Sequence, residues 1–122
     1  MDDEWFTPLA DELAQCLLDA RACATACEEL LAEAQERLDP DAQRRLLSAV
    51  VAAAAVSRVL VEALDRPRQL VLAAAEVCRD TTLQAAETLQ ELALPLDSAA
   101  AIEALRRTSA SAGAFVEAAR RR

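Results

Sequence analysis

The chain contains no histidine, no lysine and no tyrosine, and it has a single glycine among its 122 residues. Without histidine it lacks the usual general base, the Ser-His and Cys-His nucleophile pairs, and the Glu-x-x-His ligands of di-iron bundles. No carboxylates converge on a predicted buried face, so a dyad for acid–base catalysis is not indicated either. We therefore expect a protein that is not an enzyme.

Aromatic residues are also scarce, at two Phe and one Trp, although hydrophobic residues make up 54% of the chain. Thirty residues are alanine, which is the strongest helix former. A core of such small and aliphatic side chains suits closely packed helices. Length and composition predict one all-α domain that covers residues 1–122.

The formal net charge is −8, and no basic stripe is present that would bind nucleic acid. All thirteen basic residues are arginine, which is typical of a GC-rich bacterial coding bias. The N-terminal "MDDEWF" does not resemble a secretory signal, and the apolar run from Leu46 to Leu60 is short and interrupted for a membrane span. We expect a cytoplasmic protein with no membrane partner, whose thiols stay reduced.

Prolines divide the chain into segments. Three of them stand where a helix is expected to begin, next to polar residues that can cap it: Pro8, Pro40 and Pro67. The fourth boundary is the linker "LALPLDSAA", with Asp97 or Ser98 as the cap. The expected helices cover residues 8–37, 40–64, 67–93 and 98–120. Connections this short favour antiparallel neighbours, so the sequence predicts an up-down-up-down four-helix bundle.

Counting at about 100° per residue predicts which side of each helix faces the core. In the first helix this side holds Leu9, Leu13, Cys16, Ala20, Cys23, Cys27, Leu31 and Ala34, with Asp19 opposite. In the second it holds Leu46, Ala49, Ala53, Val56, Leu60 and Leu64. In the third it holds Val71, Ala74, Cys78, Ala85, Leu89 and Leu92. In the last it holds Ala101, Leu105, Thr108, Ala112, Phe115, Val116 and Ala119.

The outer face of the second expected helix is unusually apolar as well. Val51, Ala55 and Val59 lie there, and an exposed apolar patch often marks a contact with another chain. The Trp5-Phe6 pair is a second candidate for such a contact. We expect a homo-oligomer or a protein partner that binds through the second helix or through this aromatic pair.

The four cysteines are the main candidates for chemistry. Cys16, Cys23 and Cys27 are spaced seven and four residues apart, which places them on one face of one helix, and Cys78 also points inward. Cys23 and Cys27 have Cα atoms about 6 Å apart in a helix, so their thiolates can approach one Cu(I), a soft ion.

Cys16 and Cys78 each need a partner from elsewhere. Cys16 is about 10.5 Å of helical rise from Cys23. Cys78 is expected at a depth between these two, where it would be able to complete a three-coordinate site from across the core. The alternative for every cysteine is packing as a small apolar side chain.

Hydroxyl residues on the inward faces are candidates for a small polar cavity. They are Ser57, Thr81, Thr82, Thr108 and Ser109. Hydroxyls on helices usually bond to the carbonyl four residues earlier. We expect that local arrangement here, without a ligand site.

The segments "CLLDARACATAC", "AAAEVCRDTTLQAA" and "AIEALRRTSASAGAF" resemble those of the cysteine-rich four-helix-bundle copper storage proteins of bacteria. The resemblance covers nearly the whole chain. It implies a four-helix bundle whose core thiolates hold Cu(I), with Cys16, Cys23, Cys27 and Cys78 at metal-binding positions.

The chain departs from that family where the cysteine ladder would continue. The third and fourth helices carry other residues there, namely Val71, Ala74, Thr81, Ala85, Ala101, Leu105, Thr108 and Ala112. The second helix has no cysteine, and the histidines often found near the bundle mouth are absent. The resemblance therefore implies a protein that binds one or a few Cu(I) ions. The alternative is a metal-free helical interaction or scaffold protein, because a fold does not by itself imply a function.

Overall fold

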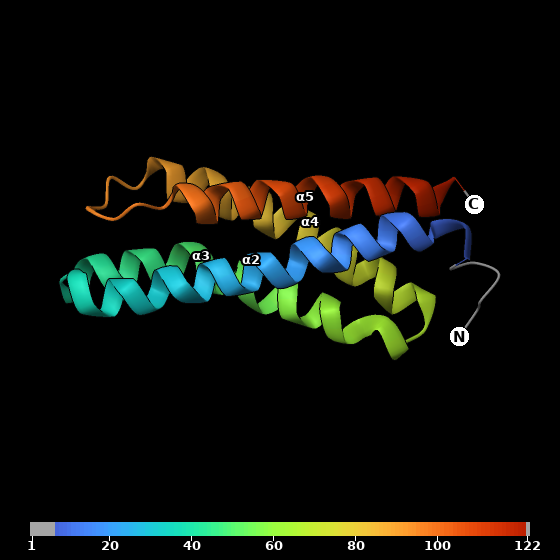
Figure 1. Cartoon of the computed structure of the whole chain (residues 1–122), viewed down its shortest axis with the longest axis horizontal. Helices are drawn as coiled ribbons and strands as arrows, with labels where there is room; N and C mark the ends of the chain where they lie inside the picture. Colours follow the sequence, from blue (N-terminus) through green and yellow to red (C-terminus); the bar gives the residue numbers. More distant parts are fainter. Residues whose placement is uncertain (1–6, 122) are drawn as a thin grey trace.

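The computed structural model describes residues 7–121, apart from the side chains of Thr7 and Leu64. Four α-helices account for most of this range, which contains no strand (Figure 1). They are α2 (Ala10–Arg37), α3 (Pro40–Glu62), α4 (Arg68–Glu91) and α5 (Ala99–Arg120). Two short 3-10 turns, η1 (Thr7–Leu9) and η2 (Ala63–Asp65), precede α2 and follow α3. The predicted all-α class is confirmed.

The predicted helix boundaries are right to within two residues. The differences occur where the chain tightens or extends at a helix end, as is common. The turn at residues 63–65 is 3-10 rather than α-helical, and α4 stops before Leu92, whose backbone is extended.

Side-chain caps mark two of the helix starts. Asp39 accepts a hydrogen bond from the backbone N–H of Ala42 at 2.8 Å, and the proline that follows it lies in the first turn of α3. This confirms the predicted cap. At α5, Ser98 occupies the cap position without a side-chain cap bond, whereas Asp97 accepts from the Ala99 N–H at 3.1 Å.

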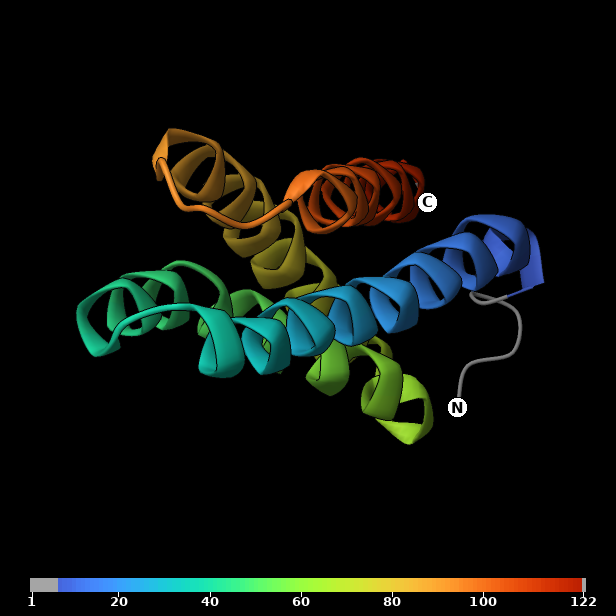
Figure 2. The same ribbon diagram turned by 60° about the vertical axis from the view of Figure 1, so that its left-hand side comes forward.

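The four helices pack side by side. α2 contacts α3 and α5, and α4 contacts the same two helices. Figure 2 shows that they cross one another at an angle. This packing is consistent with a four-helix bundle. Within residues 7–121, no helix combines the length and the apolar character needed to cross a membrane.

The core consists of two apolar clusters. One contains Cys16, Cys78 and Phe115, and the other contains Cys23 and Cys27. Along each of α3, α4 and α5, one or two buried residues with a hydroxyl group separate the residues of one cluster from those of the other. These residues are Ser57, Thr82, Thr108 and Ser109. We call these four residues the hydroxyl layer.

Most of the predicted inward residues are buried, including all four cysteines and every residue predicted for α5. Some are only half-buried, namely Leu31, Ala49, Val56, Ala74 and Leu92. Asp19 was predicted to face away from the core, and this is wrong, because the residue is buried and only 6% exposed. It lies where α2 packs against α5, and the Thr108 hydroxyl is 3.0 Å from its carbonyl oxygen. The side chain of Leu64, and Trp5 and Phe6, lie outside the described part of the chain.

Candidate functional site

Cys23 and Cys27 lie one helical turn apart on the buried side of α2. Both side chains are fully buried and pack in the same apolar cluster. The interaction between the two thiols is the largest influence on the pKa of each of them. The structure therefore brings together the pair that the spacing of four residues predicts.

These two thiols have different acidities. The hydrogen bond with Cys27 lowers the pKa of Cys23, burial opposes this effect, and hydrogen bonds with Ser57 and Thr108 add to it. The same bond raises the pKa of Cys27, as do its burial and the negative charges of Cys23 and Glu28. The pair as a unit thus releases one proton readily and retains the second.

Cys16 and Cys78 belong to the other cluster and are also fully buried. The pKa of Cys16 is raised to about 12, mainly by burial and also by the charges of Cys78 and Asp19, whereas a hydrogen bond with Ser111 opposes the shift. Burial also raises the pKa of Cys78 to about 11, although Ser57 opposes the shift. At neutral pH both are protonated thiols that pack as small apolar groups.

Ser57 of α3 connects the two sets of thiols. Its Oγ lies 3.9 Å from the Sγ of Cys78, and it also forms a hydrogen bond with Cys23. Cys78 interacts electrostatically with Cys23 and with Cys16. Among residues 7–121, however, no three His, Cys, Asp or Glu side chains are arranged to hold a metal ion.

The buried hydroxyls are satisfied in two ways. Thr82 and Thr108 lie 2.6 and 2.8 Å from the carbonyl four residues earlier, as predicted. The predicted bond to the carbonyl four residues earlier is wrong for Ser109, whose hydroxyl donates to a backbone carbonyl of α4 at 2.8 Å. It is also wrong for Ser57, whose hydroxyl lies beside the thiol of Cys78. Thr81 is half-buried and lines a surface groove between α3 and α4. In the described part of the chain, every buried side-chain nitrogen or oxygen has a hydrogen-bond partner.

Sequence reasoning missed two polar neighbours of Cys16. Ser111 forms a hydrogen bond with its thiol, and the charge of Asp19 acts on it. Asp19 is three residues after Cys16, and Ser111 is three residues after the inward-facing Thr108. Residues three apart share a helix face, so this spacing was the available signal.

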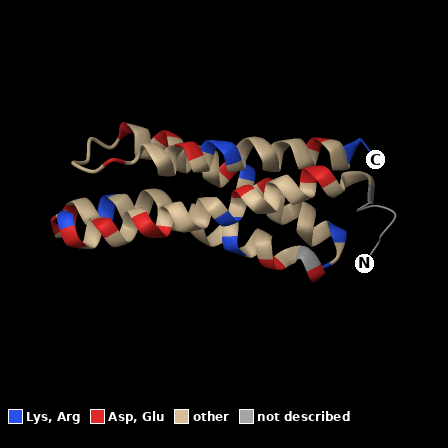
Figure 3. Cartoon of the chain, in the orientation of Figure 1, with Lys and Arg blue, Asp and Glu red and all other residues tan. Residues whose placement is uncertain are grey.

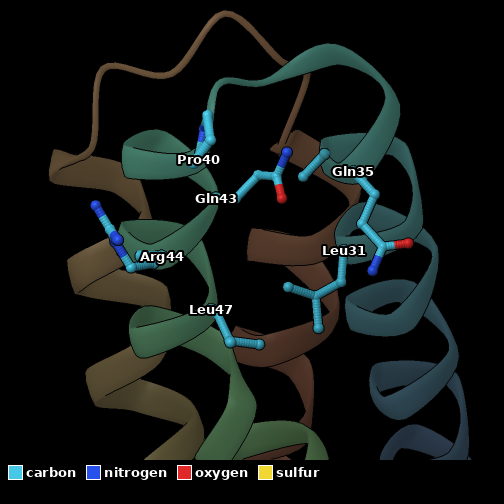
Figure 4. Close-up of a pocket in the computed structure, with 7 residues that line it drawn as sticks. Leu31, Gln35, Pro40, Gln43, Arg44 and Leu47 are labelled. Carbon is cyan, nitrogen blue, oxygen red and sulfur yellow. The ribbon is translucent and has the colours of Figure 1, made fainter.

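A surface pocket of about 380 Å³ lies where α2 ends and α3 begins (Figure 4). Side chains of both helices surround it, and the amide of Gln43 donates to the carbonyl of Leu38 at 2.7 Å. None of the described residues that line it is a cysteine or a carboxylate. It therefore offers neither a soft metal ligand nor an acidic group for catalysis.

Acidic and basic residues are interspersed along the helices (Figure 3). Some form exposed ion pairs between helices, such as Arg120 with Glu76 at 2.6 Å and Arg58 with Glu28. No known protein family, curated protein or solved structure matches the chain. The resemblance to copper storage bundles consequently rests on the residues of this chain alone.

Proposed function

We propose that the protein binds one or a few Cu(I) ions through core thiolates, as a copper storage-like bundle of reduced capacity. One observation carries the proposal: Cys23 and Cys27 form a fully buried pair one turn apart on α2, in which the pKa of Cys23 is lowered. The thiolate is the form that binds metals, and thiolate ligands favour Cu(I). The hydroxyl of Ser57 supports the thiolate of Cys23.

The first ion is held between Cys23 and Cys27. Cys78 is the next available sulfur, because Ser57 contacts both it and Cys23, and Cys16 lies beyond it. Zn(II) competes poorly at this site, since a closed zinc site takes four nitrogen or sulfur ligands, and the chain has no histidine.

We place this site in an antiparallel up-down-up-down bundle in the cytoplasm. Support for the topology comes from the short connections, from the contacts of α2 with both α3 and α5, and from the course of the colours in Figure 1. Support for the compartment comes from the four cysteines, all of which are free, because reducing conditions keep thiols in that state.

The test is an anaerobic titration of Cu(I) against a chromogenic chelator. The reduced wild type is expected to withdraw copper at low stoichiometry. Replacing Cys23 and Cys27 together by Ala should abolish uptake without loss of helical content, because Ala is the better helix former. The matched control replaces Cys16 and Cys78 by Ala and should retain most of the uptake. A wild type that withdraws no copper contradicts the proposal, as does a Cys23→Ala/Cys27→Ala variant that withdraws as much as wild type.

The second candidate function is a metal-free helical interaction protein. It is favoured by the outer face of α3, where Val51 and Val59 are 47% and 55% exposed and Ala55 is also exposed, as predicted. Under this alternative the cysteines are core packing, and the copper titration shows no uptake.

A further inference from the structure

α3 carries an exposed stripe that the thiol site does not use. Residues that alternate in steps of three and four lie along one side of a helix and can pack against a second helix. Six exposed residues of α3 follow this spacing: Arg45, Ser48, Ala52, Ala55, Val59 and Glu62. We call them the α3 stripe. It begins with a positive charge, ends with a negative charge, and has only small or apolar side chains between them.

Apolar surface widens the α3 stripe on both sides. On one side, Leu47 and Val51 are each 47% exposed. On the other, Val59 lines an apolar groove of about 460 Å³ between α3 and α4. Between Arg45 and Arg58 the chain has no charged residue. Exposed apolar surface of this extent on one helix is typical of a protein contact.

The order of residues in the α3 stripe identifies the partner. Its centre lies midway between Ala52 and Ala55, and Arg45 and Glu62 lie at equal distances from that centre. Two copies of α3 that run antiparallel about a twofold axis therefore set Arg45 of one copy opposite Glu62 of the other. Such a pairing is what an isologous interface requires, since residue i contacts residue j and j contacts i.

We infer that the protein forms a homodimer by packing α3 antiparallel against α3 of a second copy. Burial of apolar surface drives the association, the small central residues allow the helices to approach closely, and the two end charges fix the direction. Parallel packing would instead set Arg45 against Arg45 and Glu62 against Glu62. The inference does not depend on copper, because the α3 stripe contains no cysteine.

Arg45 is available for this contact although it already has a partner. Its Nε lies 3.4 Å from a carboxylate oxygen of Asp41, and both side chains are more than half exposed. Exposed ion pairs of this kind contribute little to stability. The guanidinium can therefore turn towards Glu62 of the other copy at small cost.

The first test is the mass of the full chain in solution, measured by sedimentation equilibrium over a wide range of concentration. The wild type is expected to be a dimer. Ala55→Glu places a carboxylate at the centre of the interface and should weaken dimerisation by at least about tenfold. Ala110→Glu makes the same change at an exposed position of α5 and should leave the dimer intact. Circular dichroism checks that both variants fold.

The second test exchanges the end charges. Arg45→Glu alone and Glu62→Arg alone each set like charges against one another and should weaken the dimer. The combined variant Arg45→Glu/Glu62→Arg restores opposite charges and should dimerise like wild type. A monomeric wild type, a dimer that tolerates Ala55→Glu, or a combined variant without recovery would each overturn the inference. Copper uptake by the same samples tests the other proposal separately.

Discussion

Cys23 and Cys27 lie together on one helix, whereas Cys16 and Cys78 lie on two helices and in the other apolar cluster. All four thiols are buried to the same extent, yet their pKa values differ. The pKa of Cys23 is lowered, and the pKa values of Cys16 and Cys78 are raised to about 12 and 11. Burial alone therefore does not decide how acidic each of these thiols is.

The difference comes from neighbours. Cys23 has a second thiol and two hydroxyls as hydrogen-bond partners, whereas desolvation is the main influence on Cys16 and Cys78. Hydrogen bonds to the charged form stabilise it, and an apolar surrounding does the opposite. A deep core can thus contain reactive and inert cysteines within a few turns of the same helix.

The largest expected effect is a loss of stability at alkaline pH that belongs mainly to Cys16 and Cys78. The chain has no Lys, Tyr or His, so the thiols and the terminal amine are its titrating groups from neutral pH upwards. The pKa of both thiols is raised in the folded chain from an ordinary value of 9.0. Their contribution to stability is complete below pH 9 and is lost as the pH rises towards 11 and 12.

The size of this loss follows from the shifts. A pKa difference of one between the folded and unfolded chain corresponds to about 1.4 kcal/mol, so the two thiols together account for several kcal/mol. Chemical denaturation at a series of pH values measures it. A variant with Ala in place of Cys16 and Cys78 should lose less stability, the remainder coming from Cys27, whose pKa is also raised. An equal loss in the variant and wild type would contradict this account.

Ser57→Cys tests whether a sulfur from another helix can join the Cys23–Cys27 pair. This substitution places a fifth sulfur where a hydroxyl now contacts both Cys23 and Cys78. It should convert a two-sulfur site into a three-sulfur site and tighten Cu(I) binding by about tenfold or more, which is at least about 1.4 kcal/mol. Competition with a chromogenic chelator measures the affinity.

One control applies to Ser57→Cys. Ser48→Cys, on the exposed side of α3, adds a thiol without a buried partner and should leave the affinity of the original site unchanged. If Ser57→Cys binds Cu(I) only as tightly as wild type does, the new thiol does not reach an ion held by Cys23 and Cys27.

The smallest expected effect comes from Asp19→Asn. The charge of Asp19 contributes to the raised pKa of Cys16, so its removal should lower that pKa and reduce the alkaline loss of stability by less than about 1 kcal/mol. The same denaturation series measures the difference relative to neutral pH. Asp11→Asn neutralises an exposed carboxylate on the same helix and should have no effect. An alkaline loss unchanged by Asp19→Asn would show that this carboxylate does not act on Cys16.

The fold and the Cys23–Cys27 pair were predictable because they depend on local geometry. Apolar periodicity, proline positions and a spacing of four residues act within one helix, and they led to the four helices and the neighbouring thiols. Only the position of Asp19 three residues after Cys16 signalled its burial. The cross-helix bond of Ser109 was not predictable in this way, because it depends on which helix packs beside it. The different acidities of the thiols also depend on Ser57, which reaches them from another helix.

The hydroxyl layer has a further consequence, for the alignment of the helices along their axes. Thr108 of α5 lies 3.0 Å from a carbonyl oxygen of α2, and Ser109 donates at 2.8 Å to a carbonyl oxygen of α4. A core of alanine and leucine alone tolerates sliding by one turn, since one apolar contact replaces another. Sliding α5 would break both contacts and take the buried Ser109 hydroxyl away from its partner, which is costly. The layer thereby specifies one axial register, and that register sets which residues surround Cys23.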